Sequence, residues 1–246
     1  INEKGRMTAE SKICAGLSVK ECREKVVETL KNQNLLVKEE EYVHRVGLCE
    51  RCKTITEPLV SDQWFLSMKS LAQLAIKAAR NNKIKFIPST RKKIYINWFN
   101  NIKDWNISRQ LWWGHDLPIK AEEGVLDTWF SSALWPFTTL GWPKETKDLA
   151  TFYPTTLISS AREIFFLWIG RMVFSGLEFT GKVPFSIIYT HPTVLDSKGR
   201  KMSKSLGTTV DPMDLIDNYG TDALRFGLVW QATGHQDIHW SEDAVI

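Results

Sequence analysis

Lys201-Met202-Ser203-Lys204-Ser205 is the stretch of sequence that decides the fold. It follows Asp196-Ser197-Lys198-Gly199-Arg200 and precedes Leu206-Gly207, so a glycine lies on each side of the two lysines. Lysine carries a compact ammonium on a flexible stem, and glycine permits backbone conformations that other residues resist. The pattern predicts a mobile loop that closes cations over a polyphosphate. The alternative is an ordinary solvated basic turn.

The segments before this loop alternate between strand and helix patterns. Apolar runs predict strands at 125–130 and 185–190, and the helix Arg162–Phe174 is expected between them. Strands that alternate with helices are typical of βαβ units, so we expect an α/β fold with a parallel sheet. Further predicted elements are helices at 18–31, 67–80, 91–101, 212–219 and 221–228, and a short strand at 35–37.

Capping residues mark the ends of two of these helices. Ser18 with Glu21 three residues later is a capping box. Asp211 followed by Pro212 is an N-cap with proline in the first turn, and Gly220 closes the same helix.

Composition excludes several classes of protein. The 246 residues carry a net charge of only +4, which permits local contacts with RNA but does not describe a polybasic nucleic-acid tail. No apolar run approaches the roughly 20 residues that span a bilayer. The four cysteines do not make a disulfide framework, and they indicate a reducing, cytoplasmic compartment.

Two tryptophan-rich motifs carry a resemblance to a known family. Asp104-Trp105-Asn106-Ile107-Ser108-Arg109-Gln110-Leu111-Trp112-Trp113-Gly114-His115 and Leu126-Asp127-Thr128-Trp129-Phe130-Ser131-Ser132-Ala133-Leu134-Trp135-Pro136-Phe137 resemble the valyl-tRNA synthetase family of class I aminoacyl-tRNA synthetases. The lysine-serine loop is the signature of that class. The resemblance covers essentially the whole chain, with three long motifs in family order.

The resemblance implies how the chain is organised. A His-Ile-Gly-His motif, which the family carries in the first half of its nucleotide-binding fold, does not occur in this sequence. We therefore expect an internal segment: the C-terminal half of a Rossmann-like parallel-sheet catalytic domain with a small α/β N-terminal appendage. Residues 1–45 resemble the tail of the editing insertion, 46–215 the second half of the core, and 216–246 the start of the helical stem-contact and anticodon-binding region.

The same resemblance implies the reaction and its partners. ATP, with Mg²⁺, activates valine to valyl-adenylate, and the acyl group passes to tRNA(Val). We expect no membrane contact, a monomer, and an isolated segment that is inactive alone. The alternative is a non-catalytic module, or a degenerate relative, that holds RNA or nucleotide without turnover.

The loop residues are the expected ATP ligands. Lys201 and Lys204 suit clamps on the charge that develops on pyrophosphate, since phosphoryl chemistry needs positioning and charge stabilisation. Ser203 and Ser205 lie between and after them and are expected to bind ATP with them. Of the two lysines, the resemblance gives the more direct role to Lys204.

Two further positions resemble nucleotide ligands of the family. Glu163 stands where relatives carry an acid that contacts the adenylate ribose, and a carboxylate can accept from ribose hydroxyls. The alternative is a helix N-terminal acid that pairs with the helix dipole. His191 precedes the loop as an ATP-binding candidate, but Pro192 replaces the glycine usual in the family. Ala161 and Thr208 are two more departures, from glycine and asparagine respectively.

Valine recognition needs a small dry pocket, because one methylene is worth only about 1–3 kcal/mol. The resemblance places Trp113 and Trp129 in the walls of that pocket, and large rigid aromatics suit this role. The alternative is that both are ordinary core tryptophans.

Cys49 and Cys52 have the spacing of half a zinc site, and His44 is a candidate third ligand. In relatives a second Cys-x-x-Cys comes from before the editing insertion. The alternative is a pair of free thiols in a knuckle whose partner is absent from this sequence. A thioredoxin-like redox motif is less favoured, because no strand–helix pattern frames the pair.

Overall fold

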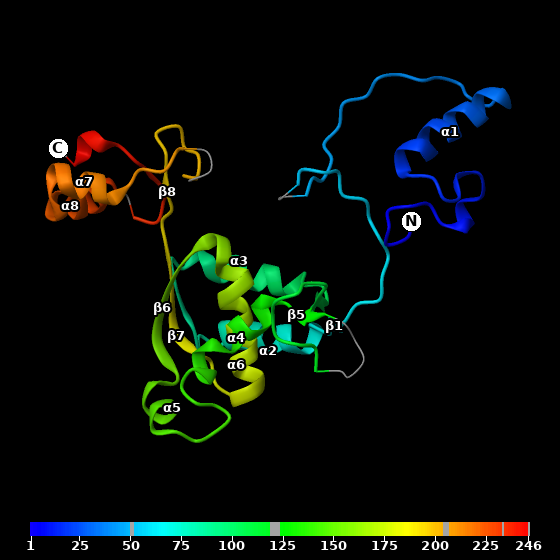
Figure 1. Ribbon diagram of the computed structural model, residues 1–246. Helices are drawn as coiled ribbons and strands as arrows, with labels where there is room; N and C mark the ends of the chain where they lie inside the picture. Colours follow the sequence, from blue (N-terminus) through cyan, green and yellow to red (C-terminus); the bar gives the residue numbers. More distant parts are fainter. Residues whose placement is uncertain (50–51, 119–123, 204–206, 233, 246) are drawn as a thin grey trace. The chain divides into compact units, whose positions relative to one another are not determined.

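The computed structural model describes residues 1–49, 52–118, 124–203, 207–232 and 234–245. The chain divides into two compact units, Ile1–Asp62 and Gln63–Ile246 (Figure 1). The expected fold class, a mixed α/β protein with a parallel sheet, is confirmed.

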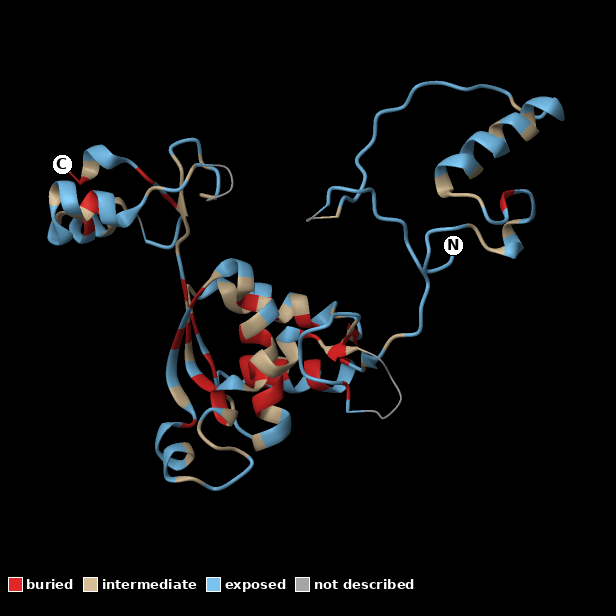
Figure 2. Cartoon of the chain, viewed as in Figure 1, coloured by how far each residue is buried: buried red, intermediate tan, exposed pale blue. Residues whose placement is uncertain are grey.

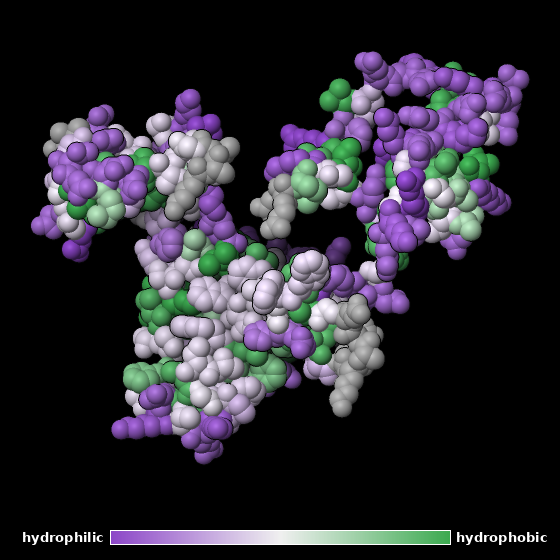
Figure 3. Space-filling model, viewed as in Figure 1, coloured by the Kyte–Doolittle hydropathy of each residue, from purple (hydrophilic) through white to green (hydrophobic). Residues whose placement is uncertain are grey.

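The first unit is built around one capped helix, α1 (Val19–Asn32). The predicted capping box is confirmed: the Glu21 amide donates to Ser18 Oγ over 3.3 Å, and the Ser18 amide donates to Glu21 Oε2 over 2.7 Å. A 3-10 helix, Ala9–Cys14, precedes it. Much of the surface of this unit is hydrophilic in the face shown in Figure 3, and α1 buries none of its side chains. Helix α1 therefore does not contribute to an extended hydrophobic core.

The first unit lacks one expected element and contains one bond that was not expected. Residues 35–37 do not form a strand, because Val37 is 99% exposed and the described residues offer this segment no strand partner. Cys14 and Cys22 are joined in a disulfide, which the cysteine count did not lead us to expect. This single bridge ties the 3-10 helix to the first turns of α1 and leaves Cys49 and Cys52 as free thiols.

The second unit is organised on a parallel sheet of three strands in the order β2-β7-β6. These strands are Lys85–Ile87 (β2), Phe185–His191 (β7) and Thr155–Ala161 (β6). The predicted strand at 185–190 is thereby confirmed. In the register of the central pair, Leu157 lies opposite Ile187, and Ala161 lies opposite His191 at the carboxyl ends.

Helices α2 (Lys69–Arg80), α3 (Thr90–Asn100), α4 (Thr128–Thr138) and α6 (Arg171–Thr180) pack around this sheet and bury the main core (Figure 2). Tyr95, Phe99 and Phe165 form edge-to-face contacts within it, an arrangement that aromatic rings prefer. The short helix α5 (Lys147–Phe152) lies in the connection that leads from α4 to β6. The helices predicted at 67–80 and 91–101 are confirmed, with their first residues shifted slightly.

The sequence misplaced two boundaries in this unit. The strand predicted at 125–130 is only Val125–Leu126 (β5), because the Asp127 side chain caps α4 by accepting from the Trp129 amide. The helix predicted from Arg162 to Phe174 begins as a 3-10 turn, Arg162–Ile164, and continues as a π-helix, Phe165–Gly170. The α-helix proper, α6, then runs to Gly181, whose φ of 70° ends it.

Short strand pairs complete the unit. β1 (Phe65–Leu66) pairs with β3 (Trp105–Asn106), and β4 (Ser108–Arg109) pairs with β5, both antiparallel. Near the C-terminus, β8 (Val194–Leu195) pairs with β9 (Ile238–His239), in parallel.

A second, smaller core lies under the last helices. The predicted helices appear as α7 (Pro212–Tyr219) and α8 (Thr221–Gln231), and Asp211 caps α7 as expected. A 3-10 helix, Glu242–Ala244, follows them. The core residues they share with the chain end are Leu215, Leu224, Trp240 and Val245. Within the described residues, no helix is long and apolar enough to cross a membrane.

Candidate functional site

The carboxyl ends of β6 and β7 lie side by side, because Ala161 and His191 are paired in register. β6 runs directly into the 3-10 turn that carries Glu163, and β7 runs into Thr193. The Thr193 hydroxyl donates to Glu163 Oε1 over 3.3 Å. In open α/β sheets, ligands bind outside the carboxyl ends of the strands. The structure therefore brings two predicted site residues, Glu163 and His191, to the expected edge.

His191 is exposed, and its Nδ1 lies 2.8 Å from the carbonyl oxygen of Pro192. A carbonyl only accepts, so Nδ1 carries the proton in this contact and Nε2 is left as an acceptor when the ring is neutral. Pro192 has no amide hydrogen to offer a ligand. The His191 ring is therefore a candidate contact to a nucleotide, and the Pro192 backbone can only accept.

An ion pair ties the two strand ends to the segment that precedes β9. Arg162 Nη2 lies 2.6 Å from Asp237 Oδ2, and the Thr193 amide donates to Asp237 Oδ1 over 3.2 Å. The Asp237 side chain is largely buried, and charge-assisted hydrogen bonds of this kind are stronger than neutral ones. This contact holds the start of the loop segment against the end of the sheet.

The turn at 196–200 leads from β8 into the lysine-serine segment. Asp196 Oδ1 accepts from the amides of Lys198 and Arg200 over 2.9 and 2.8 Å, and Oδ2 accepts from Arg200 Nε over 2.8 Å. The backbone hydrogen bond from Arg200 is the main reason that the pKa of Asp196 lies below its usual value. Gly199 has a φ of 73°, and a Cβ there would lie 2.9 Å from His239 Cε1. The turn is thus closed by one carboxylate and requires glycine.

The structure places only part of the predicted ATP-binding loop. Lys201 is exposed and bridges to Leu195 in antiparallel fashion. The Ser203 amide donates to Thr208 Oγ1 over 3.0 Å, and the Thr208 amide donates to the Ser203 carbonyl over 3.2 Å. Thr208, which replaces the usual asparagine, is therefore bonded to the Ser203 backbone through both its hydroxyl and its amide. Lys204 and Ser205 lie outside the described residues.

The two tryptophan motifs form the two arms of one hairpin. β4 pairs with β5, the Leu126 amide donates to the His115 carbonyl over 2.7 Å, and Asp116 bridges to Val125. Trp113 is 89% exposed on the first arm. Trp129 is partly buried at the start of α4 and packs against the main core. The ring contacts among the described residues do not join these two predicted pocket residues.

A buried carboxylate that the sequence analysis missed connects these arms. Asp127 is 5% exposed. Its Oδ2 accepts from Trp105 Nε1 over 2.8 Å and from Arg109 Nη2 over 3.0 Å, and it lies 3.6 Å from Arg171 Nη1. The Arg171 guanidinium also stacks over the Trp105 ring, 3.8 Å from its centroid. Burial lowers the pKa of Arg171, while the negative charge of Asp127 opposes that shift.

Comparison with known proteins decides the family. The family described as tRNA synthetases class I (I, L, M and V) matches residues 5–123 and 118–241. This chain belongs to the class I tRNA synthetases. The two matched ranges together cover nearly the whole chain, including both strand ends, the hairpin and the lysine-serine loop.

Several curated valine–tRNA ligases are similar to this chain. It is 46% identical to that of Symbiobacterium thermophilum over 272 aligned residues, which cover 100% of this chain and 30% of the relative. It is 48% identical to that of Petrotoga mobilis, with 97% and 30% covered, and 48% identical to that of Thermotoga maritima, with 91% and 29% covered. The chain therefore spans about 30% of the length of these relatives.

A solved structure supports the fold of this synthetase. Mycobacterium tuberculosis methionyl-tRNA synthetase in complex with methionyl-adenylate superposes with a TM-score of 0.68 over 83% of this chain and 40% of that one. At 22% identity, this likeness bears on the fold alone. It agrees with the Rossmann-like parallel sheet expected from the sequence.

Leu48 and Ile55 form an antiparallel bridge on either side of the two cysteines. The Cys49 amide donates to the Thr54 carbonyl over 2.8 Å, and Cys52 Sγ lies 3.2 Å from Thr54 Oγ1. The side chain of Thr54 is the main cause that lowers the pKa of Cys52 to about 7. His44 instead stacks on Tyr42. The described residues contain no group of three metal-ligating side chains, so the predicted half-site gains no third ligand from them.

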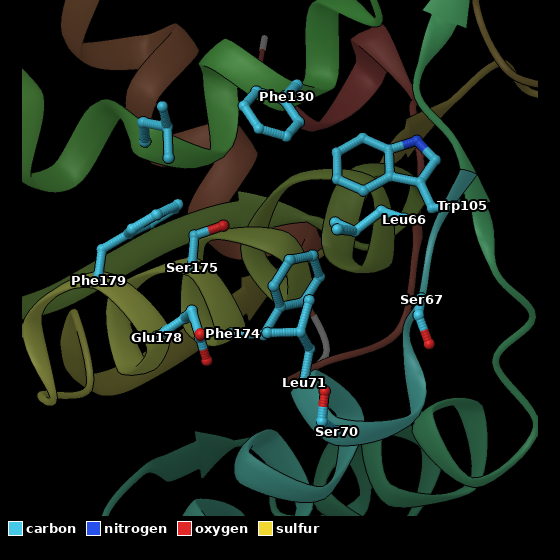
Figure 4. Close-up of a pocket in the computed structure, with 11 residues that line it drawn as sticks. Leu66, Ser67, Ser70, Leu71, Trp105, Phe130, Phe174, Ser175, Glu178 and Phe179 are labelled. Atoms are coloured by element: carbon cyan, nitrogen blue, oxygen red, sulfur yellow. The ribbon is translucent and has the colours of Figure 1, made fainter. Parts of the chain in front are cut away.

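The synthetase also has an apolar cavity of about 300 Å³ bounded by α2, α4 and α6 (Figure 4). In Figure 4 the six-membered ring of Trp105 faces this cavity, and the indole nitrogen lies on the other side of the ring. None of the predicted site residues that the structure describes lines the cavity. Trp105 thus lines this cavity with its ring and donates to Asp127 with its indole nitrogen. The lining residues are Leu66, Ser67, Ser70, Leu71, Trp105, Phe130, Leu134, Phe174, Ser175, Glu178 and Phe179.

Proposed function

We propose that this chain is the part of a valine–tRNA ligase that carries the second half of the active site. The support is its identity of 46–48% to valine–tRNA ligases across nearly its whole length. The observation that carries the proposal is the placement of Glu163 and His191 at the carboxyl ends of adjacent strands, directly before the lysine-serine loop. The ligase activity belongs to the longer protein, because the chain spans about 30% of its relatives.

The reaction has two steps. A carboxylate oxygen of valine attacks the α-phosphorus of ATP, a C–O–P bond forms, and the bond to the leaving pyrophosphate breaks. The acyl carbon of valyl-adenylate is then attacked by a ribose hydroxyl at the end of tRNA(Val), and AMP leaves. Both steps need the nucleotide held in line more than they need covalent help from the protein.

We assign each residue a role in this reaction from its position in the structure or the sequence. Glu163 accepts from the ribose hydroxyls, since a carboxylate has lone pairs beyond the one that Thr193 occupies. Lys201 and Lys204, assisted by Ser203 and Ser205, neutralise the charge that builds on pyrophosphate. His191 lies beside the nucleotide at the same edge of the sheet.

Valine itself is held by the hairpin. Trp113 and Trp129 form walls that exclude side chains longer than that of valine by shape, and Trp113, which is 89% exposed in this chain, has a ring available to a facing surface. The domain ranges stay as expected from the sequence: 1–45 as the tail of an editing insertion, 46–215 as the core, and 216–246 as the start of the tRNA-binding helices.

Mg²⁺ enters this reaction with ATP, whose phosphates coordinate it. Among the carboxylates near the strand ends, Glu163 is assigned to the ribose, and Asp196 and Asp237 already bind Arg200 and Arg162. No carboxylate of this chain is therefore assigned to the metal. Cys49 and Cys52 fit two of the four ligands of a structural zinc, and the others would come from the rest of the longer protein. We place the enzyme in the cytoplasm as a monomer.

Valine-dependent exchange of labelled pyrophosphate into ATP tests the proposal on the complete protein that contains this chain. Exchange should be stimulated by valine far more than by isoleucine, leucine or methionine, and valine should be attached to tRNA(Val). The competing function is a non-catalytic module that binds RNA or nucleotide, which the substitutions Ala161 and Pro192 favour. Binding of ATP without any exchange would support that alternative.

A further inference from the structure

Asp127 lies where four separate parts of the second unit meet. It follows β5 on the second arm of the hairpin, and its amide donates to the Ile107 carbonyl on the first arm over 2.7 Å. Its Oδ2 accepts from Trp105 and Arg109 of the first arm. Arg171, the first residue of α6, approaches the same oxygen. One carboxylate oxygen thus faces three donors from outside its own segment.

The other oxygen of Asp127 acts on the helix that carries Trp129. Oδ1 accepts from the Trp129 amide over 3.3 Å, as an N-cap does at the start of α4. The backbone of Trp129 is therefore bonded to the same carboxylate that binds Trp105 and Arg109. A shift of this carboxylate would move Trp129 relative to the arm that carries Trp113.

We propose that Asp127 is a positioning residue for the valine pocket, setting the distance and angle between the two motifs that supply its walls. The inference rests on the proposed role of Trp129 as one of those walls. Asp127 does not touch the amino acid. It acts through the Trp129 backbone on one side and through Arg109 and Trp105 on the other.

The charge balance of the cluster explains why a carboxylate is needed at this position. Asp127 is buried between two guanidiniums, and Arg171 is itself largely buried, with 12% of its side chain exposed. A buried charge is tolerated only when it is paired and hydrogen-bonded. Hydrogen bonds from Trp105 Nε1 and Arg109 Nη2 hold the carboxylate in one orientation, and the Arg171 guanidinium contributes its charge from 3.6 Å without a hydrogen bond.

Asp127→Asn separates this role from simple helix capping. Asparagine is as good an N-cap as aspartate, so the start of α4 is preserved. The amide presents only one oxygen, and its NH₂ group meets donors where Oδ2 accepted. The helix start and the backbone pairing of the arms are thus kept, while the side-chain bonds from Asp127 to Trp105 and Arg109 are lost.

The test is steady-state pyrophosphate exchange by the complete synthetase that contains this chain. We expect Asp127→Asn to raise the KM for valine by about tenfold to a hundredfold, as small displacements of positioning groups do. The KM for ATP and the rate at saturating valine should stay within about threefold, because the loop and strand ends are untouched. Discrimination against alanine should weaken in the same variant.

Asp104→Asn is the matched control. Asp104 lies in the same motif and accepts from the Met68 amide at the start of α2 over 3.0 Å, outside the Asp127 cluster. It should leave the KM for valine unchanged. Trp105→Phe keeps the ring under Arg171 but removes the donor to Asp127, and it should shift the KM for valine in the same direction by a smaller factor. This variant keeps the test valid should Asp127→Asn fold poorly.

Trp129→Ala separates failure of this inference from failure of the pocket itself. If Trp129→Ala raises the KM for valine while Asp127→Asn and Trp105→Phe do not, Asp127 is only a helix cap and the inference is overturned. If Trp129→Ala leaves the KM for valine unchanged, the pocket assignment has failed, and the positioning role is overturned with it. Equal rises in the KM values for valine and ATP would point to general loosening and would also overturn it.

Discussion

Glu163 and Thr193 join the ends of two adjacent parallel strands, with the Thr193 hydroxyl donating to Glu163 Oε1 over 3.3 Å. Glu163 follows β6 and Thr193 follows β7. The bond holds the carboxylate at the edge of the sheet where a nucleotide ribose binds in folds of this kind. The position of Glu163 is therefore set by the sheet register and by one hydroxyl, and its remaining lone pairs are left for a ligand.

Glu163→Gln should raise the KM for ATP in the complete synthetase by about fivefold to tenfold, because hydrogen bonds to a charged group are stronger than neutral ones by about 1 kcal/mol. The KM for valine should not change. Glu178→Gln is the control, since Glu178 lies on α6 at the apolar cavity instead of at the strand ends. Equal effects of the two substitutions on ATP would remove Glu163 from the nucleotide site.

The turn before the loop should respond to acid through Asp196. Its pKa is lowered by the amide of Arg200, so the carboxylate stabilises the turn fully above the pKa of an unfolded aspartate. That stabilisation is lost as the pH falls through the lower, folded pKa. We expect the amide proton shifts of Lys198 and Arg200 to titrate together at a pH below the ordinary range for aspartate. Asp196→Asn should abolish this titration, and a midpoint at or above the usual aspartate value would contradict it.

Cys52 should react with iodoacetamide at lower pH than an ordinary thiol, because the Thr54 hydroxyl lowers its pKa to about 7. The alkylation rate measured against pH should have its midpoint near this value. Thr54→Val should move the midpoint upward, since it removes the hydroxyl and keeps the side-chain shape. Mass spectrometry separates Cys52 from Cys49. Protection of both thiols by added zinc in the complete protein would support the half-site, and an unshifted midpoint in Thr54→Val would exclude the proposed cause.

A polypeptide of residues 1–246 should not catalyse valine-dependent pyrophosphate exchange above background. The sequence contains no His-Ile-Gly-His motif, and the sheet described here has three strands in its parallel part. Half of the nucleotide contacts expected for the class are therefore missing from this polypeptide. Exchange that requires valine and disappears in Lys204→Ala would be the contrary result.

Local signals predicted the fold well wherever the responsible residues are close in sequence. The capping box of Ser18 and Glu21 and the Asp211-Pro212 cap were readable because both partners lie within one helical turn. The strand 185–190 was readable from its apolar run, since most side chains of this central strand are buried or half-buried. By contrast, residues 35–37 are apolar enough for a strand, but a strand needs a partner that no local pattern reveals.

The Asp127 cluster could not be predicted, because it depends on contacts between distant segments. Asp127 and Arg109 are 18 residues apart in the sequence, and Arg171 lies at the start of α6. The sequence gives both motifs, but a buried carboxylate is visible only once the hairpin is folded. The start of α6 was misplaced for a related reason: the preceding π-helical turn is set by how Phe165 and Ile169 pack into the core.

Lys204→Ala in the complete synthetase should lower the rate of valyl-adenylate formation far more than it weakens valine binding. In the proposed assignment valine is held by the hairpin, whereas charge on pyrophosphate builds only as the α-phosphorus is attacked. A cation aimed at that charge acts mainly on the transition state, and losing one such donor costs about 2.7–4 kcal/mol, or about 10² to 10³ in rate.

Pre-steady-state adenylate formation, measured over ranges of valine and ATP, separates the limiting rate from the dissociation constants. Lys198→Ala is the matched control for Lys204→Ala, because Lys198 is exposed in the Asp196 turn and its backbone amide, not its ammonium, makes the turn contact. It should change the limiting rate by less than about threefold. Lys204→Arg should rescue only in part, since a planar guanidinium does not replace a compact ammonium on a flexible stem. If Lys204→Ala leaves the limiting rate unchanged and raises the dissociation constant for valine, the catalytic role of Lys204 is wrong. Lys204 would then contribute to valine binding instead.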